Sequence, residues 1–453
     1  MHCSNWRYAV KMHDLIRYAI KEAESQGASD AEAFLMTSRE SEVFIENNDL
    51  KQGKSQTTGS MGIRILLNGS LGFYSINRIS KDRIQQAVSM AIKIAQVSPK
   101  DKYNSLPGKL KVNKLSGIYD RKAESFEASD AVKEATQMLQ TAKSCDKRVS
   151  VDSGNFTSSI MEQSLGNSNG VYLTEKLSAF SWSIMGMAIA DDDVSSFDFQ
   201  VGSTHHVKDI KVQTTATEFA ETVINSLGTH KIESFRGEML LTPAAVNELI
   251  EDVISHSINS DAVQKKSSYF AGKLGKQVAS DLLTLEDDAT NTEALGASSF
   301  DREGVPHKRN IVIEKGILKK FLYNTYTAKK DGVRSTGNAA GSAASTPSVS
   351  TTNILIKQGG STLDTLISEM ESGIILSRFS GNVNPVNGDF SGVVKGGRFV
   401  KDGQVQYAVK EVMVAGNIFE ALHELTGISE ERKVIYDSVL PYMTFNNISF
   451  TAG

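Results

Sequence analysis

The 453-residue sequence is long enough for two or three domains that each bury a core. Its 49 Lys and Arg nearly balance its 53 Asp and Glu, and no block of like charge stands out, so we expect no contact with nucleic acid, because proteins that bind it carry a basic stripe. Two cysteines, Cys3 and Cys145, are too few for a disulfide framework, and no apolar run approaches the ~20 residues that cross a bilayer, so we expect a cytoplasmic protein without membrane contact.

The start of the chain predicts a helix, a strand and a hairpin. Residues 14–26 carry an apolar stripe at helical spacing, and Gly27 is suited to end that helix. Met12 stands beside the start of this helix and is a candidate initiator. Residues 31–46 alternate like a strand, and the dipeptide Asn68-Gly69 predicts the turn of a hairpin, because both residues tolerate positive φ.

The following segment predicts three more helices and a further set of strands. Ser80 is suited to cap the second helix, the third begins near Ser129, and the fourth stops at Gly228. Between residues 147 and 200 the pattern is that of strands. The residues of the third helix that we expect to face inward are Val132, Ala135, Met138, Leu139 and Ala142.

A polar stretch over residues 229–237 divides the chain. Before it we predict a domain over 12–228 of mixed α/β structure, with hairpins and amphipathic helices. After it we predict a strand-rich domain over 236–453 that contains a helix from about Ala244 to Asn259. Hairpins, instead of short βαβ crossovers, join the strands, and this favours the α+β class over a doubly wound sheet.

Two segments of the second half are rich in small residues, 332–348 and 380–392. Each has too few large side chains to pack by itself, and long loops inside compact domains are usually functional or disordered. We therefore predict that both are loops that line a substrate cleft. The residues expected to bind substrate there are Gly337, Asn338, Gly388, Asp389 and Phe390.

Other familiar catalytic patterns are incomplete. The sequence contains no G-x-S-x-G elbow, and the glycines at 337–341 are not followed by the Lys-Ser/Thr of a phosphate-binding loop. His205-His206 has no acidic or cysteine partner at ligand spacing, which favours a solvated loop pair. Asp191–Asp193 lacks the alternating acids of a calcium loop and is better interpreted as a turn.

A series of landmarks in the second half resembles the TldD/PmbA family, a metallopeptidase family also described as modulators of DNA gyrase. In chain order these landmarks are LGKQVASDLLTLEDD (274–288), the segment from SSFDREG to GNAAG (298–341), GDFSG (388–392), DGQVQYAVKEVMVAGNIFEAL (402–422) and the ending VLPYMTFNNISFTAG. The resemblance implies two subunit types. The TldD-like type is a zinc peptidase with an HExxxH helix and a later cysteine ligand. The PmbA-like (TldE-like) type lacks that set and pairs with the first around a cleft for unfolded peptide.

The resemblance places the metal motif on LTPAAVNELIEDVISHS, at Glu251, Asp252 and His256, and the cysteine position on Tyr436. Catalytic zinc takes three protein ligands and a water, and a neutral phenol is a poor ligand. Positions five apart on an ideal α-helix differ by roughly 140°, so a π-type bulge would be needed to direct Glu251 and His256 at one ion. Asp252 is also shorter than the Glu that serves as the base.

We therefore expect a PmbA/TldE-like chain that binds no metal itself and whose TldD-like partner carries the zinc. Its other partners would be unfolded peptide substrates and, as a further option, a second copy of itself. One alternative is an active zinc metallopeptidase that uses a variant Glu251/His256 site. Another is a non-enzymatic protein that modulates a topoisomerase.

Overall fold

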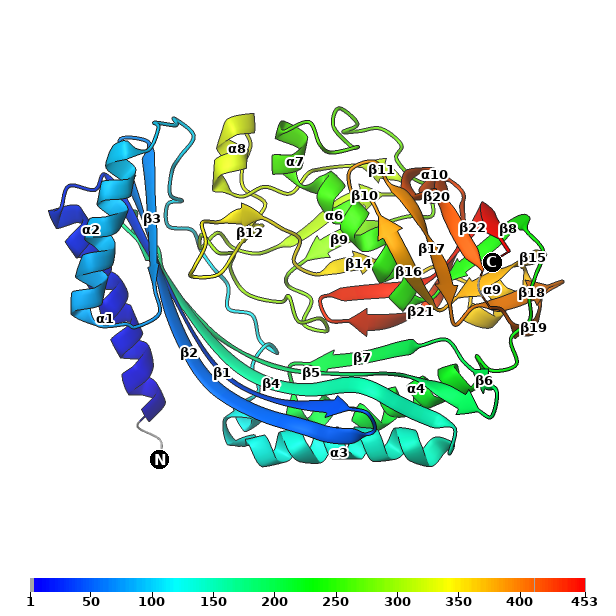
Figure 1. Cartoon of the computed structure of the whole chain (residues 1–453). Coiled ribbons are helices and arrows are strands. Elements are labelled where there is room, and N and C mark those ends of the chain that lie inside the picture. The colour runs from blue at the N-terminus through cyan, green and yellow to red at the C-terminus, as the bar shows by residue number, and fades with distance from the viewer. Residues whose placement is uncertain (1–3, 411, 453) are drawn as a thin grey trace.

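Long antiparallel strands in the first half of the chain form a strongly curved sheet (Figure 1), which we call the curved sheet. The computed structural model describes residues 4–410 and 412–452, so that Cys3 lies outside the described residues. Among these residues the strand order is β3-β2-β1-β4-β5-β6, and β7 pairs with β5. The strands are β1 (Asp30–Glu46), β2 (Asp49–Leu67), β3 (Ser70–Ile76), β4 (Val149–Asn167), β5 (Tyr172–Ala190), β6 (Asp193–Val194) and β7 (Asp198–Thr204).

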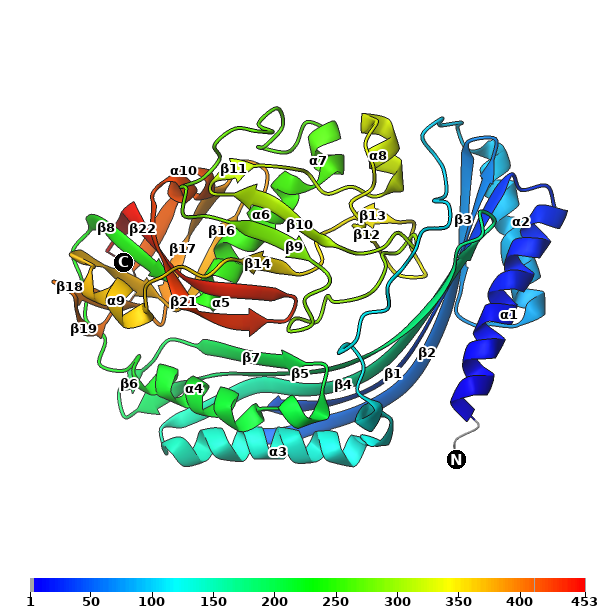
Figure 2. The ribbon, with the colours of Figure 1, turned by 180° about the vertical axis from the view of Figure 1, so that it is seen from behind.

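Helices cover the convex face of the curved sheet (Figures 1 and 2). They are α1 (Ser4–Ser25), α2 (Lys81–Val97), α3 (Ala128–Cys145) and α4 (Val212–Ile224), with 3-10 turns at Arg121–Ser125 and Val207–Asp209. Two predicted signals are confirmed: the turn at Asn68 and Gly69 has positive φ at both residues, and Ser80 caps α2. The prediction for Val132 is wrong, since it is 41% exposed. Ala131, one residue earlier, completes the buried stripe of α3 instead.

The second half of the chain lies on the concave side of the curved sheet (Figures 1 and 2). Its main sheet contains thirteen of the described strands, in a path β11-β10-β9-β14-β22-β8-β15-β18-β19 with further strands beside it. The strands are β8 (Phe235–Leu241), β9 (Leu285–Asp288), β10 (Arg309–Glu314), β11 (Ile317–Leu318), β14 (Ile354–Ile356), β15 (Ser372–Leu376), β16 (Arg378–Val383), β17 (Asp389–Lys395), β18 (Arg398–Lys401), β19 (Gln404–Ala408), β20 (Met413–Asn417), β21 (Leu425–Ile435) and β22 (Ser438–Thr451). A separate pair joins β12 (Ala339–Ala340) to β13 (Ser348–Val349).

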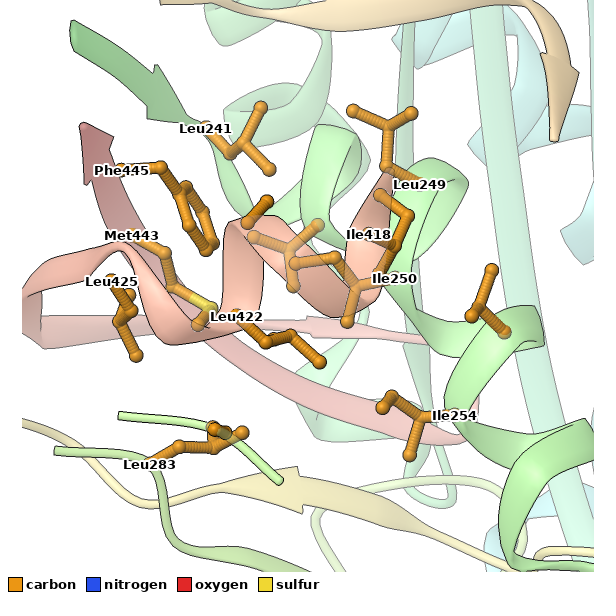
Figure 3. Packing of buried hydrophobic residues seen from close by; sticks show 14 of the residues in the cluster. Leu241, Leu249, Ile250, Ile254, Leu283, Ile418, Leu422, Leu425, Met443 and Phe445 are labelled. Atoms are coloured by element: carbon orange, nitrogen blue, oxygen red, sulfur yellow. The ribbon is translucent and has the colours of Figure 1, made fainter. Parts of the chain in front are cut away.

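Short helices pack on this sheet. They are α5 (Pro243–Val246), a π-helical segment (Asn247–Glu251), α6 (Asp252–Ile258), α7 (Ser260–Gln264), α8 (Thr325–Asp331), α9 (Leu363–Ser368) and α10 (Ile418–His423). The core of this half is continuous: in Figure 3, Ile250 of the π-helical segment lies beside Ile418 of α10, within one buried cluster that also contains Met443 and Phe445 of β22. This packing fixes the helix on which the metal motif was predicted.

The expected loop over 380–392 is instead a hairpin of β16 and β17, so that part of the prediction is wrong. Gly381 and Gly392 face each other across the two strands, and the ring of Phe379 lies against both. A Cβ on either glycine would come within 2.7 Å of that ring. The aromatic ring thus supplies the packing that the small residues lack, as aromatic side chains do over paired glycines in other sheets.

A buried network of charges joins the curved sheet to the second half. Glu32 of β1 accepts from Arg64 of β2 at 2.6 Å and from Arg302 at 2.8 Å, and Arg64 also donates to Glu303 at 2.9 Å. All four side chains are at most 9% exposed. Burial alone would raise the pKa of Glu32, but the two guanidinium groups outweigh burial and hold that pKa below its usual range. These buried ion pairs therefore hold the two halves of the chain against each other.

The architecture confirms the predicted α+β class, a mixed N-terminal part followed by a strand-rich C-terminal part. The proposed division at 12–228 and 236–453 stays a prediction. Within the described part of the chain, no helix combines the length and the apolarity that crossing a membrane requires.

Candidate functional site

The predicted metal motif lies on a helix that changes its pitch. Thr242 caps the start, where its Oγ accepts from the Ala245 N–H, and Pro243 occupies the first turn. Residues Asn247–Glu251 are π-helical and lead directly into α6 at Asp252. The π-helical segment therefore ends at Glu251, and the residues between Glu251 and His256 are regular α-helix, so the bulge that ligands five residues apart would require does not lie between them.

Glu251 lies in an acidic and largely buried position. Burial, followed by the nearby Asp437 and Asp252 carboxylates, raises the pKa of Glu251 to about 7. Among the described residues, the side chain that hydrogen-bonds to it is Asn247, one turn earlier. Burial also raises the pKa of Asp437, which directly follows Tyr436 in the turn between β21 and β22. The fold thus pairs Glu251 with Asp437, a neighbour that the sequence reasoning missed because it considered Tyr436 at this turn.

The other residues at the predicted metal positions have different surroundings. The Nε2 atom of His256 lies 3.0 Å from the carbonyl oxygen of Ser267, so a protonated Nε2 donates a hydrogen bond to the main chain. Asp252 is exposed. Burial raises the pKa of Tyr436, which keeps its phenol neutral, and its backbone φ of 54° places it in the left-handed region at the turn.

These residues do not fit a catalytic zinc. In residues 4–410 and 412–452, no three His, Cys, Asp or Glu side chains are grouped so that they could hold an ion. Glu251 and Asp437 are acceptable ligand types, but the Ser267 carbonyl engages Nε2 of His256, which leaves only Nδ1 of that ring for an ion, and the third position is a phenol. No metal-dependent step is therefore derived for this chain.

The segment 332–348 is packed between the two halves. Asn338 is 1% exposed, and its amide donates to Asp287 at 2.7 Å and to the Ser350 carbonyl at 3.1 Å. A Cβ on Gly62 of the curved sheet would lie 2.4 Å from the carbonyl oxygen of Ala343, so small residues let the two backbones approach closely. These contacts give Asn338 a structural role, and its assignment to substrate binding stays a prediction without support from them.

The other predicted substrate residues behave similarly. Gly337 has φ of +79°, and Gly388 has φ of +80° with no room for a side chain against Phe419. Phe390 is buried. Asp389 is the exposed member, and it accepts hydrogen bonds from Asn387 at 2.7 Å and Asn417 at 2.8 Å. The fold does not bring the two predicted groups together into a site that the described contacts define.

The prediction of a solvated His205-His206 pair is wrong for His205, which is 2% exposed. Its Nδ1 lies 2.7 Å from the Ser178 carbonyl oxygen and its Nε2 lies 3.3 Å from that of Ala294. Burial lowers the pKa of His205. The residue therefore joins β5 to the second half of the chain, and it does not serve as a ligand.

Three family profiles cover most of the chain. The PmbA/TldA metallopeptidase domain 1 matches residues 31–95, the central domain matches 121–227, and the C-terminal domain matches 235–452. The chain belongs to the PmbA/TldD family. This conclusion confirms the resemblance seen in the sequence landmarks.

Relatives of this PmbA/TldD-family chain match it over nearly their whole length. An uncharacterised protein of Methanocaldococcus jannaschii is 27% identical, covering 93% of this chain and 97% of the relative. The metalloprotease PmbA of Escherichia coli O157:H7 is 24% identical, covering 90% and 89%. The crystal structure of TldE from Thermococcus kodakarensis has a TM-score of 0.90 at 22% identity, covering 97% and 99%. The last likeness shows that the fold is shared.

Replacing Glu251 with Gln is expected to stabilise this protein at alkaline pH by about 1–3 kcal/mol. The folded-state pKa of about 7 lies above the usual carboxyl value. The stability contributed by the bound proton is therefore full below the unfolded pKa and is lost as the pH rises through 7. Urea unfolding of both proteins at pH 4.5, 6 and 8.5 measures this, and the curves should separate only toward high pH. A stability difference that is the same at all three pH values would contradict a Glu251 carboxyl whose pKa is raised in the folded protein.

Proposed function

We propose that this chain is the PmbA/TldE-like subunit of a TldD-type metallopeptidase complex in the cytoplasm. The complex degrades unfolded peptides, and its zinc is bound by the TldD-like partner. One observation carries the proposal. At the position of the HExxxH helix, in a chain of a metallopeptidase family, Glu251, Asp252 and His256 do not group with a third ligand among the described residues. The helix is present, but the described residues do not provide the three grouped ligands that a catalytic zinc and its water need.

The retained helix has a structural use. Its apolar side belongs to the main core of the second half, with Leu249, Ile250 and Ile254 buried against α10 and β22 (Figure 3). Losing a ligand from its polar side leaves this packing intact, whereas losing the helix would open the core. A chain that shares the peptidase fold without its zinc set can therefore still present a surface that pairs with a related subunit.

Co-expression with a TldD-like chain that has an intact HExxxH motif tests the proposal. We expect the two chains to co-purify as one species, and we expect hydrolysis of an unfolded peptide to require both. The matched variants are Glu251→Gln in this chain, which should leave the activity of the complex unchanged, and the Glu of the partner's HExxxH changed to Gln, which should abolish it. No association, or activity that does not depend on this chain, would refute the proposal.

Metal analysis of this chain purified alone distinguishes the proposal from the alternative in which this chain is itself an active zinc metallopeptidase. The proposal expects less than about a tenth of a zinc per chain, because tight zinc sites need a complete set of ligands. A tightly held, stoichiometric ion that Glu251→Gln or His256→Ala removes would assign the peptidase activity to this chain. We found no contact in the described residues that favours a topoisomerase partner.

A further inference from the structure

Positive charge is concentrated in one segment of the chain. From Lys308 to Arg334 the sequence contains eight Lys and Arg but two acids, Glu314 and Asp331, a formal charge of +6 where the whole chain carries −4. The cations stand singly or in adjacent pairs such as Lys319-Lys320, so the sequence shows no long run of like charge. Whether these cations lie close together in space depends on the fold.

Three stretches of this segment lie side by side. The Lys319 N–H donates to the Val312 carbonyl at 2.8 Å, which places 319–323 next to β10. The Thr336 N–H donates to the Tyr323 carbonyl at 3.1 Å, which places 334–336 at the end of 319–323. The Lys308 Nζ lies 3.5 Å from the Ser335 carbonyl oxygen and closes the group. These contacts gather Lys308, Lys320 and Arg334 into one place, which we call the basic junction.

The cations of the basic junction lack compensating acids. Neighbouring cations are paired, Arg309 with Glu286 and Lys319 with Glu314. No ion pair joins Lys308, Lys320 or Arg334 to a carboxylate in the described ranges 4–410 and 412–452. Burial, followed by the charges of Lys320 and Arg334, lowers the pKa of Lys308. Like charges held together in this way cost free energy that an anionic ligand would recover.

The surroundings favour a peptide ligand over a nucleic acid. Proteins that bind single strands stack bases on exposed aromatic rings. The aromatic residues of the stretch 319–323 are Phe321, which is buried, and Tyr323, which is half-buried and whose hydroxyl donates to Asp331 at 3.1 Å. The junction therefore offers no freely exposed ring on which a base could stack, while carboxylates can form charge-assisted hydrogen bonds with Lys320 and Arg334.

We propose that the basic junction binds the carboxylates of an extended, Asp- and Glu-rich segment of unfolded polypeptide, and so recruits acidic substrates to the complex. The proposal rests on the proposed function and names a substrate class for it. Lys308 directly precedes β10 and Arg334 follows α8, two elements of the second half of the chain (Figure 1). It uses none of the residues at the HExxxH position.

Peptide binding to this chain alone tests the proposal. The probe is a fluorescein-labelled, unstructured peptide of alternating Glu and Ser, measured by fluorescence anisotropy beside a peptide with Lys in place of Glu and an oligothymidylate. We expect binding of the Glu peptide alone, and we expect it to weaken as salt rises, because the Debye length falls from about 10 Å at 0.1 M to about 3 Å at 1 M. The double variant Lys320→Gln/Arg334→Gln should bind about tenfold more weakly.

The matched control is Lys54→Gln/Lys93→Gln, which removes the same charge from exposed positions on β2 and α2 and should retain the affinity. Thermal unfolding followed by circular dichroism checks that both variants are folded, and competition of wild-type binding by unlabelled Glu peptide gives a readout that needs no variant. Equal loss in both variants, or binding of the Lys peptide, would overturn the proposal. Tighter binding of the oligothymidylate would overturn it in favour of nucleic acid. If acidic peptide does not bind while the chain still co-purifies with its TldD-like partner, the recruitment idea fails and the subunit role stands.

Discussion

Changing Glu32 to Gln is expected to lower the free energy of unfolding by about 3–5 kcal/mol, the cost of leaving buried charges unpaired. Glu32 is 1% exposed and accepts from both Arg64 and Arg302. Gln keeps the shape of the side chain but offers one neutral oxygen to two guanidinium groups. Two buried cations would then share the single carboxylate of Glu303. Urea unfolding at pH 7 measures the loss.

The matched control is Glu46→Gln, which breaks the pair with Lys51 at 3.1 Å, where the side chains are 48% and 64% exposed. Exposed pairs contribute about 0–1 kcal/mol, so this variant should unfold almost as the wild type does. The difference between wild type and Glu32→Gln should shrink in acid. The folded-state pKa of Glu32 is depressed, so its contribution is present above the ordinary carboxyl pKa and is lost as the pH falls through the lower, folded value. Equal effects of the two variants would contradict the network.

Local signals in the sequence identified most elements of the fold because each acts within a few residues. Asn68-Gly69 determines its own turn through backbone conformation, and Ser80 caps α2 through a bond to the N–H three residues on. The hairpin at 380–392 was not predicted because its packing comes from Phe379, whose ring compensates for the facing glycines. Val132 and Ala131 differ by one step on the helix, and the position of the curved sheet decides which of them is buried.

The candidate site was less predictable, because its properties come from residues that are distant in sequence. Glu251 and Asp437 are 186 positions apart, and nothing in either segment signals that one carboxylate raises the pKa of the other. The family resemblance directed attention to Glu251 and Tyr436 but could not show that Ser267 engages His256. The basic junction was missed for the same reason, since three separate stretches contribute one cation each.

Asn338 provides a test of how the segment 332–348 is held inside the second half, because substitution by Asp changes one atom and the charge. Asn338 Nδ2 donates to the buried Asp287 carboxylate at 2.7 Å, and Thr352 donates to the same group through its N–H at 2.6 Å. Burial raises the pKa of Asp287, and the Asn338 and Thr352 donors oppose that shift. A second carboxylate in place of the amide would remove a donor and add a like charge in a site that excludes water.

The expected cost of Asn338→Asp is about 3–5 kcal/mol at pH 8, measured by urea unfolding, and it should diminish toward pH 5 as the two acids share a proton. Asn387→Asp is a closely matched control, since Asn387 Nδ2 also lies 2.7 Å from a carboxylate oxygen, that of Asp389, but in an exposed turn. Water and salt screen that pair, so its cost should stay below about 1 kcal/mol. If the two variants lose equal stability, burial is not what makes the Asn338–Asp287 contact important. If Asn338→Asp stays fully stable and instead weakens peptide binding, Asn338 would return to the substrate site that its sequence context predicted.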